Sequence, residues 1–263
     1  MNINTLVVKL GGGEGLNMPR ACADLARIDR PLVVVHGVSE RMRQLCDERG
    51  VEVQMLTSPT GHSSRYTNEQ TREIFVEAAQ QINHEIVKLL RSHNINAISV
   101  TDAIYGERKA ALRAVVNGRI RMIRDDYSGS ITGVNGDYIR NLLQQGYVPV
   151  VTPMATSPDG YLNIDGDRAS AAIAGALNAE ELLILSNVQG LFRDFSDPNS
   201  LIAQIPSHQL DQAMDWAQGR MKRKVLGAQE ALAGGVSRVI IGDGRVDNPV
   251  TQALNGMGTV FLS

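Results

Sequence analysis

The chain of 263 residues is poor in cysteine: it has two, Cys22 and Cys46, with no metal-ligand spacing. This scarcity excludes a disulfide framework and a cysteine metal site, and it predicts buried or incidental thiols in a reducing compartment. The net charge of -2 excludes a global basic field for nucleic acid. No apolar run approaches the roughly 20 residues that cross a bilayer, and no basic leader precedes the first apolar segment. We therefore expect a cytoplasmic protein that binds neither nucleic acid nor membrane.

What the sequence does have is an alternation of short β-forming segments with helical segments. The alternation favours an α/β fold of three layers, an αβα sandwich with a central mainly parallel sheet. We expect one domain, residues 1–263, with an N-terminal lobe of about 1–160 and a C-terminal lobe of about 161–263 that meet near the Pro158-Asp159-Gly160 turn. The β-forming segments are residues 5–10, 31–36, 51–56, 96–100, 147–152, 182–186 and 238–241.

Three helices can be located from their ends. The first is predicted to begin near Thr67, whose hydroxyl would cap it with Gln70 as the reciprocal partner. Its apolar face follows steps of three and four residues. A second helix is predicted to open at Gly166 or Asp167, and a third covers residues 220–233 and stops at a glycine pair. The apolar face of the first helix consists of Ile74, Ala78, Ile82, Ile86 and Leu89 or Leu90.

Residues 108–134 have a different pattern. An Asn117-Gly118 dipeptide lies between β-forming residues, which is the strongest short signal for a hairpin turn. We expect a hairpin that is attached to the main sheet.

Two of the predicted strands end in glycine turns. Lys9 precedes Gly11 and Gly12, which lets backbone amides approach an anion beside a lysine, although an ordinary strand-to-helix turn with a surface lysine explains the same residues. Neither the P-loop spacing nor the dinucleotide fingerprint is present. The second turn contains His36 and Gly37, and parallel strands would bring both turns to one edge of the sheet. We expect His36 to orient its loop through a hydrogen bond rather than to catalyse.

Polar residues precede two of the predicted helices. Arg65 comes just before the first helix, where its guanidinium suits a substrate carboxylate, unless it is an exposed loop arginine. Asn163, Asp165 and Asp167 precede or open the second helix, where a turn and an N-cap would explain them. Alternatively, Asp167 orients Lys9 and a second lysine through ion pairs.

The third helix opens with four cations in five positions, which is unfavourable against the helix dipole unless an anion lies in front of it. Nucleotide phosphates would supply that anion. We expect Lys222 and Arg223 to be solvated and Lys224 to contact the phosphates. Carboxylates, lysines and glycine turns without cysteine or histidine ligands favour phosphoryl transfer.

In this order and spacing, the motifs resemble the amino acid kinase family over residues 6–262. Within the family the chain is most similar to the acetylglutamate kinase branch, and there to the subgroup whose substrate, 2-aminoadipate or glutamate, is attached to the acidic amino-group carrier protein LysW. Pointers to that subgroup are residues 64–67, 185–191 and 242–249. The family motifs are Lys9-Leu10-Gly11-Gly12, His36-Gly37, Ser64-Arg65-Tyr66-Thr67, Asn163-Ile164-Asp165-Gly166-Asp167 and Gly219-Arg220-Met221-Lys222-Arg223-Lys224.

The resemblance implies a carbamate kinase-like fold and transfer of the γ-phosphoryl group of ATP, with Mg²⁺, to a side-chain carboxylate, which gives an acyl phosphate. It implies a homodimer in lysine or arginine biosynthesis, with acceptor binding in the N-terminal lobe, ATP binding in the C-terminal lobe and no protein ligand to a metal. Lys9 and Lys224 would neutralise the transferring group, with Asp167 holding both. The resemblance assigns ATP to Gly11, Gly12, Ser186 and Asn187, and the acceptor to Gly37, Val38, Arg65 and Asn163.

Val38 stands where the family usually has a second glycine, so its side chain is expected to crowd the substrate or to change the loop dihedrals. For an acidic carrier the sequence offers a basic region in the hairpin, unless these cations form a solvated hairpin. Alternative functions are an N-acetylglutamate kinase and a non-catalytic sensor on the same fold. One methylene is worth about 1–3 kcal/mol in a pocket, so aminoadipate and glutamate stay undecided. The basic region comprises Arg108, Lys109, Arg113, Arg119, Arg121 and Arg124.

Overall fold

The computed structural model describes residues 4–59, 63–109, 111–116 and 119–263. Its centre is an eight-stranded sheet in the order β14-β16-β15-β13-β1-β2-β10-β5. Neighbouring strands are parallel except β15 and β16, which are antiparallel. The expected mainly parallel sheet is confirmed. The strands are β1 (Leu6–Leu10), β2 (Leu32–His36), β5 (Ala97–Val100), β10 (Val148–Val151), β13 (Glu181–Ser186), β14 (Gln204–Ile205), β15 (Arg238–Asp243) and β16 (Thr259–Leu262).

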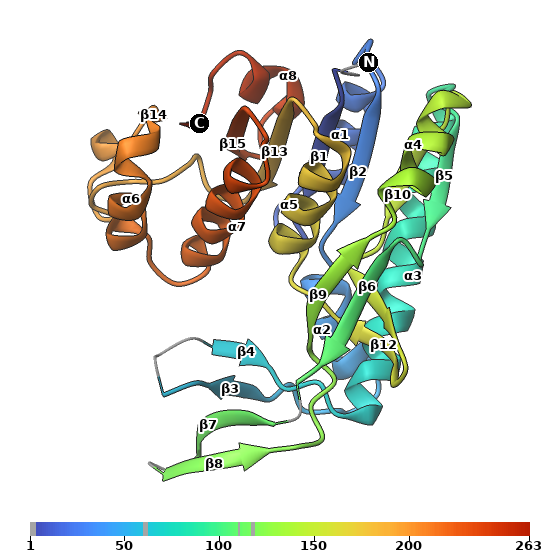
Figure 1. Ribbon diagram of the computed structural model, residues 1–263, viewed down its shortest axis with the longest axis vertical. Helices are drawn as coiled ribbons and strands as arrows, with labels where there is room; N and C mark the ends of the chain where they lie inside the picture. Colours follow the sequence, from blue (N-terminus) through green and yellow to red (C-terminus); the bar gives the residue numbers. More distant parts are fainter. Residues whose placement is uncertain (1–3, 60–62, 110, 117–118) are drawn as a thin grey trace.

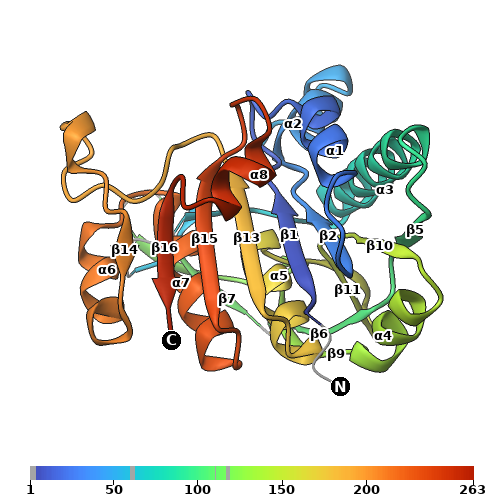
Figure 2. The same ribbon diagram turned by 90° about the horizontal axis from the view of Figure 1, so that it is seen from above.

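Helices cover both faces of the sheet, as expected for three layers (Figure 2). One face carries α1 (Met18–Leu25), α3 (Glu69–Ser92) and α8 (Pro249–Leu254), with α2 (Ser39–Glu48) packed on α3. The other face carries α4 (Gly136–Gln144), α5 (Gly166–Leu177) and α7 (Met221–Ala233), with α6 (Leu210–Trp216) beside α7. Within the described residues, no helix is both long and apolar enough to span a membrane.

Alternation along β1 decides which face receives Lys9. Leu6, Val8 and Leu10 pack in the buried cluster under α1 and α3, whereas Val7 packs in the cluster on the α5 and α7 side. Successive side chains of a strand point to opposite faces, so Lys9 shares the face of Val7. The lysine therefore lies on the same side of the sheet as α5.

Residues 51–56 do not form a strand of the central sheet, so that prediction is wrong. β3 (Met55–Thr57) begins later and pairs antiparallel with β4 (Ser63–Arg65) in a separate two-stranded sheet. Val51 and Val53 instead pack against the apolar cluster between α2 and α3. These β-branched side chains are buried against helices and are not part of a β-ladder.

The predicted hairpin exists, but it is not attached to the main sheet. β7 (Leu112–Val116) and β8 (Arg119–Ile123) form a two-stranded sheet of their own, and the Asn117-Gly118 turn lies outside the described residues. The flanking β6 (Ile104–Arg108) and β9 (Gly129–Val134) join β11 (Met154–Ser157) and β12 (Gly160–Asn163) in a four-stranded sheet. The β3–β4 and β7–β8 hairpins project together at the bottom of Figure 1.

The ends of α5 and α7 agree with the sequence, but the start of α3 does not. Asn68, not Thr67, caps α3 by accepting from the backbone N–H of Thr71, so the Thr67 and Gln70 capping box is wrong. Asp165 caps α5, which begins at Gly166, and α7 ends before a glycine pair. The predicted apolar face of α3 is confirmed: Ile74, Ala78, Ile86 and Leu90 are buried, and Ile82 is partly buried.

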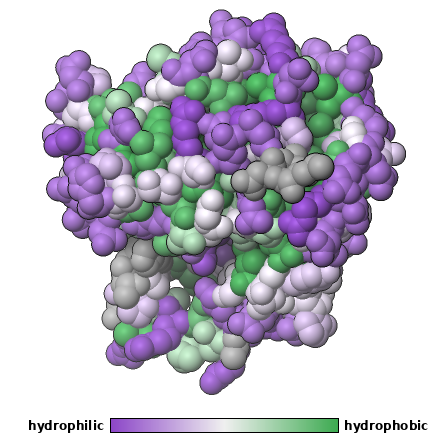
Figure 3. All heavy atoms as spheres, turned by 45° about the horizontal axis from the view of Figure 1, so that its top comes forward, coloured by the Kyte–Doolittle hydropathy of each residue, from purple (hydrophilic) through white to green (hydrophobic). Residues whose placement is uncertain are grey.

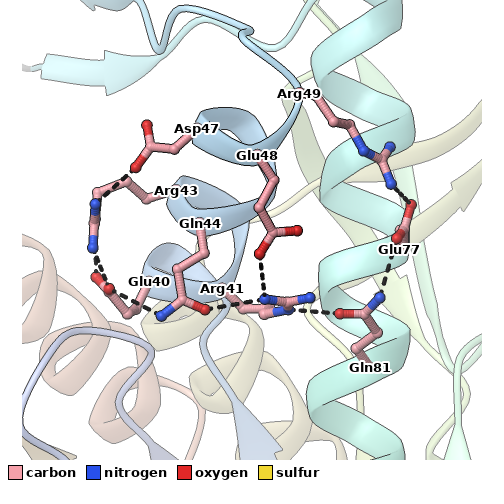
Figure 4. A network of polar contacts seen from close by, with 9 residues as sticks. All are labelled: Glu40, Arg41, Arg43, Gln44, Asp47, Glu48, Arg49, Glu77 and Gln81. Carbon is pink, nitrogen blue, oxygen red and sulfur yellow. Dashed lines mark hydrogen bonds and ion pairs between the residues drawn. The ribbon is translucent and has the colours of Figure 1, made fainter.

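A polar network fastens α2 to α3 (Figure 4). Arg41 on α2 donates to Gln81 on α3 at 2.6 Å, and Arg49, just after α2, pairs with Glu77 at 2.6 Å. Exposed pairs contribute little singly, but this set bridges two helices along their length. It holds the helix that starts directly after the second glycine turn.

Candidate active site

Two lysines from opposite ends of the chain contact one carboxylate. The Nζ atom of Lys9 on β1 lies 2.8 Å from Oδ1 of Asp167, and the Nζ atom of Lys224 on α7 lies 3.0 Å from Oδ2. The three residues are 6%, 9% and 5% exposed for Lys9, Lys224 and Asp167. Three ionic side chains that are so deeply buried must be paired with one another, because an unpaired buried charge is strongly destabilising.

A glycine allows α7 to reach this carboxylate. Gly227 lies one turn after Lys224, and a Cβ built on it would be 3.2 Å from the carbonyl oxygen of Asp167. The close approach of α7 to the first turn of α5 therefore depends on the missing side chain. It places Lys224 opposite Lys9, across Asp167.

The charges around this carboxylate shift the pKa values of Asp167 and Lys224. Burial alone would raise the pKa of Asp167, but Lys9 and Lys224 hold it well below its usual range. Burial lowers the pKa of Lys224, and the charge of Lys9 lowers it further, against the opposing effect of Asp167. One anion between two cations leaves a positive excess at the site, which suits a polyanionic ligand.

The two glycine turns contact each other at the ends of β1 and β2. A Cβ on Gly12 would lie 2.2 Å from the carbonyl carbon of Gly37, and a Cβ on Gly37 would lie 2.5 Å from the nitrogen of Gly12. A Cβ on Gly11 would lie 3.0 Å from the carbonyl oxygen of Leu185 on β13. The two glycine turns and the end of β13 thus meet at one edge of the sheet, as expected for a ligand site.

Val38 does not occupy the site in the way that the sequence suggests. Its side chain is 8% exposed and packs with Met42 of α2 and Phe75 of α3. Its φ of -132° is an ordinary value for a residue with a side chain. The expected crowding is therefore wrong, because the valine side chain forms part of the α2–α3 core, whereas altered loop dihedrals stay a prediction.

Arg65 and Asn163 are connected through Thr67. A guanidinium nitrogen of Arg65 donates to the carbonyl oxygen of Ser39, at the start of α2, at 3.4 Å. Asn163 Nδ2 donates to Thr67 Oγ1 at 3.0 Å, and this hydroxyl donates to the Arg65 carbonyl oxygen at 3.3 Å. Burial lowers the pKa of Arg65, and the charge of Arg220 acts in the same direction. The half-buried Arg65 thus lies near the second glycine turn and near the cations that open α7.

Ser186 and Asn187 lie at the end of β13. Ser186 is buried, and its carbonyl oxygen accepts from the N–H of Gly244 at 2.6 Å, whereas Asn187 is exposed. The hydrogen bond joins the loop after β13 to the loop after β15. Both residues stay predictions as ATP contacts.

The starts of α2 and α7 have no side-chain cap. Val38 and Arg220 occupy the N-cap positions, and neither side chain bonds an N–H of the first turn. The N–H groups of Glu40, Met221 and Arg223 donate to backbone carbonyl oxygens, so the positive end of each helix dipole is what favours an anion here. Lys222 and Arg223 are exposed, as expected, and Arg223 also pairs with Asp165 at 3.4 Å.

His36 is held as expected, but by a partner that the sequence did not reveal. Its Nδ1 lies 3.4 Å from the carbonyl oxygen of Gly37, and its Nε2 lies 3.4 Å from Nδ2 of the buried Asn83. Asn83 also donates to the carbonyl oxygen of Val150 at 2.8 Å. Burial lowers the pKa of His36 to about 4, so the ring is neutral near pH 7. The signal for this contact in the sequence was a single amide side chain, Asn83, on the apolar face of α3.

No metal cluster is present among residues 4–59, 63–109, 111–116 and 119–263, where no three His, Cys, Asp or Glu side chains are grouped to hold an ion. The carboxylates nearest the two lysines already have partners. Asp167 pairs with both lysines, and Asp165 accepts from two backbone N–H groups of α5. The donor set of lysines, arginines and open amides fits a polyphosphate.

A model of the amino acid kinase family matches residues 4–243. The chain belongs to the amino acid kinase family. Among its relatives, the "[LysW]-aminoadipate kinase" of Deinococcus radiodurans is 43% identical over 98% of this chain and 91% of that protein. The protein of the same name from Thermus thermophilus is 40% identical, with 97% and 99% covered. With these named kinases, membership of the family makes the chain a phosphotransferase.

Solved structures agree on the fold. The N-acetylglutamate synthase of Neisseria gonorrhoeae, complexed with coenzyme A and N-acetyl-glutamate, has a TM-score of 0.80 at 24% identity. That match covers 99% of this chain and 59% of the longer synthase. The carbamate kinase of Giardia lamblia bound to AMP-PNP has a TM-score of 0.68 at 18% identity, with 98% of each chain covered. The expected carbamate kinase-like fold is confirmed.

Proposed function

We propose that this amino acid kinase phosphorylates the side-chain carboxylate of 2-aminoadipate bound to the carrier protein LysW, using ATP, and forms an acyl phosphate. The observation that carries the proposal is the pair of buried lysines on Asp167, beside two touching glycine turns. The relatives named for this activity match nearly the whole chain. The product would serve lysine biosynthesis.

Lys9 and Lys224 supply the main catalytic contribution. Negative charge is spread over the transferring phosphoryl group, and fixed cations stabilise it in a site that excludes water. Asp167 binds one lysine through each of its oxygens and so keeps both ammonium groups at fixed positions. The amides of Gly11 and Gly12 and the open first turn of α7 face the nucleotide in this proposal.

The acceptor needs orientation rather than activation. A carboxylate is ionised near pH 7, so it can attack phosphorus without a general base. Arg65 would bind the α-carboxylate and Asn163 the amide of the acceptor, beside Gly37 and the backbone of Val38. The distal carboxylate then lies in line with the terminal phosphate.

Mg²⁺ would enter with ATP, because the nearby carboxylates Asp165 and Asp167 are engaged by protein donors. When bound, Mg²⁺ neutralises charge on the phosphates of the nucleotide. We assign the acceptor mainly to residues of about 1–160, with Asn163 added from the second lobe, and ATP mainly to residues of about 161–263, with Gly11 and Gly12 added from the first. A homodimer, a cytoplasmic location and a role in arginine biosynthesis stay predictions of the family resemblance.

An acyl-phosphate trap tests the proposal. Hydroxylamine converts acyl phosphates to hydroxamates, so we would compare carrier-bound aminoadipate, carrier-bound glutamate and free N-acetylglutamate with ATP. We expect hydroxamate with the carrier-bound acceptors and none with N-acetylglutamate. Hydroxamate with N-acetylglutamate alone would establish an acetylglutamate kinase instead. ATP binding without hydroxamate from any acceptor would favour a sensor.

We propose that the β7–β8 hairpin receives the acidic carrier. Arg113, Arg119 and Arg121 are exposed there, beside the exposed apolar Val115 and Ile120. Figure 3 shows hydrophilic and hydrophobic residues side by side on the projecting part that the β3–β4 and β7–β8 hairpins form together. Lys109 and Arg124 are exposed as well. Arg108 is less available, because it stacks on the ring of Tyr127 and donates to the carbonyl oxygen of Asp126.

Charge reversal tests this surface. Arg119→Glu with Arg121→Glu should raise the KM for carrier-bound acceptor and leave the affinity for ATP unchanged, with the difference shrinking at high salt. Lys88→Glu, an exposed reversal on α3, is the matched control. Unchanged carrier kinetics in the double variant would place the carrier elsewhere.

A further inference from the structure

Thr67 lies between the two residues proposed to bind the acceptor, and it is fully buried. Its hydroxyl accepts from Asn163 Nδ2 at 3.0 Å and donates to the carbonyl oxygen of Arg65 at 3.3 Å. Its backbone N–H donates to Asp126 Oδ2 at 2.9 Å, and its carbonyl oxygen accepts from the N–H of Tyr127 at 2.7 Å. Every polar group of the threonine therefore has a partner.

The single proton of this hydroxyl decides how the Asn163 amide is turned. Because the proton is donated to the Arg65 carbonyl oxygen, the hydroxyl can only accept from Asn163. With the hydroxyl proton on the Arg65 carbonyl oxygen, the amide nitrogen of Asn163 faces Thr67 and donates to its hydroxyl. In the described part of the chain no group donates to Asn163 Oδ1, so this half-buried oxygen stays available as an acceptor.

Both ends of the Thr67–Asn163 link are anchored. Asp126 is 2% exposed and fixes the backbone of the threonine. The carbonyl oxygen of Tyr127 accepts from the N–H of Asn163 at 3.0 Å. The guanidinium groups of Arg72 and Arg108 lie over the ring of Tyr127, at 4.0 and 4.1 Å from its centroid. These two contacts restrain the ring and the segment that precedes β9.

We propose that Thr67 is a positioning residue for the acceptor pocket. It holds the Asn163 amide with Oδ1 free to accept from an N–H next to the acceptor's α-carboxylate, and it holds the backbone of Arg65. Thr67 thereby acts on the acceptor through Arg65 and Asn163 without touching it. This inference rests on the proposed function, because Arg65 and Asn163 must bind the acceptor.

Thr67→Val tests the inference, since valine keeps the volume and loses the hydroxyl. We expect the KM for carrier-bound acceptor to rise about tenfold, the scale of one lost hydrogen bond, while the KM for ATP changes less than twofold. Thr67→Ser should restore most of the affinity. Thr71→Val, which removes a buried hydroxyl at the neighbouring helix cap, is the matched control. Thermal unfolding identifies unstable variants, and Thr67→Ala then replaces Thr67→Val.

A double-mutant cycle separates this inference from the proposed function. Asn163→Ala should raise the KM for the acceptor, and adding Thr67→Val should then have an effect at least threefold smaller than in the wild type. If Asn163→Ala raises the KM but Thr67→Val does not, the positioning role is refuted and the pocket stands. If neither variant changes the KM, Asn163 does not bind the acceptor and the proposed pocket itself is wrong. Equal shifts in both substrates' KM values would show a merely structural threonine.

Discussion

Replacing either buried lysine by methionine removes one ammonium group and keeps most of the side-chain volume. If Lys9 and Lys224 stabilise charge that develops in the transition state, each loss should raise the barrier by about 3 kcal/mol, as for other transition-state donors. At 1.36 kcal/mol per tenfold, that is about a hundredfold fall in kcat. The KM values for both substrates should change less. In the ground state the phosphates keep their negative charge, and Mg²⁺ still neutralises it, so binding is less affected than the transition state.

The stability cost should be smaller than for an ordinary buried pair. Breaking a buried ion pair costs about 3–5 kcal/mol when a charge is left without a partner. Here Asp167 keeps one lysine after either replacement, and the two lysines no longer repel. Asp167→Asn is different, because it leaves two ammonium groups facing each other. We expect Asp167→Asn to be less stable than either lysine variant.

The assay is single-turnover hydroxamate formation, with urea unfolding of each variant in parallel. Lys222→Met is the matched control, since this lysine lies on the same helix and is exposed. It should keep kcat within about twofold and lose almost no stability. Near-normal turnover in Lys9→Met or Lys224→Met, with folded protein, would refute the catalytic assignment.

Three further outcomes follow from the same geometry. Because burial and a second cation lower the pKa of Lys224, the alkaline limb of kcat/KM against pH should fall below the ordinary lysine range near 10.4, and Asp167→Asn should move it lower still. Burial lowers the pKa of His36 to about 4, so unfolding takes up a proton between pH 6.5 and 4. Urea titrations should therefore lose roughly 3 kcal/mol of stability as pH falls through that window, and His36→Gln should flatten the loss. Gly12→Ala should abolish turnover, because its Cβ would meet the backbone of the second glycine turn at 2.2 Å, whereas Gly13→Ala, with its nearest neighbour at 3.8 Å, should be mild in both activity and thermal unfolding.

Strand alternation and helix ends could be predicted because they depend on neighbours in the sequence. The pattern around β1 and the Asp165 cap of α5 sufficed to suggest that Lys9 and Asp167 meet, and they do. The cationic start of the third helix indicated Lys224 as a phosphate contact, and the family resemblance supplied its catalytic role. From residue types alone, each of the three residues Lys9, Asp167 and Lys224 could equally have had an ordinary structural role, such as a surface lysine or a helix cap.

What failed depended on contacts between distant segments. Thr67 has the chemistry of an N-cap, but Asn68 caps α3, and the threonine hydroxyl instead joins Arg65 and Asn163. Val38 looked like an obstruction because its partners in α2 and α3 cannot be read from a loop motif. In both cases the side chain contacts a partner that is at least partly buried and distant in the sequence, and it therefore does not take the role that the local sequence favoured.

The site carries more positive charge than its own carboxylate can balance. Asp167 neutralises one of two ammonium groups, and the uncapped starts of α2 and α7 add the positive ends of two helix dipoles. Without a ligand this excess is unfavourable: burial is the main cause of the lowered pKa of Lys224, and the charge of Lys9 lowers this pKa further. A fully compensated site would be more stable but would attract polyphosphate weakly. In the proposed function this positive excess favours binding of a nucleotide, and it is placed where charge accumulates during transfer.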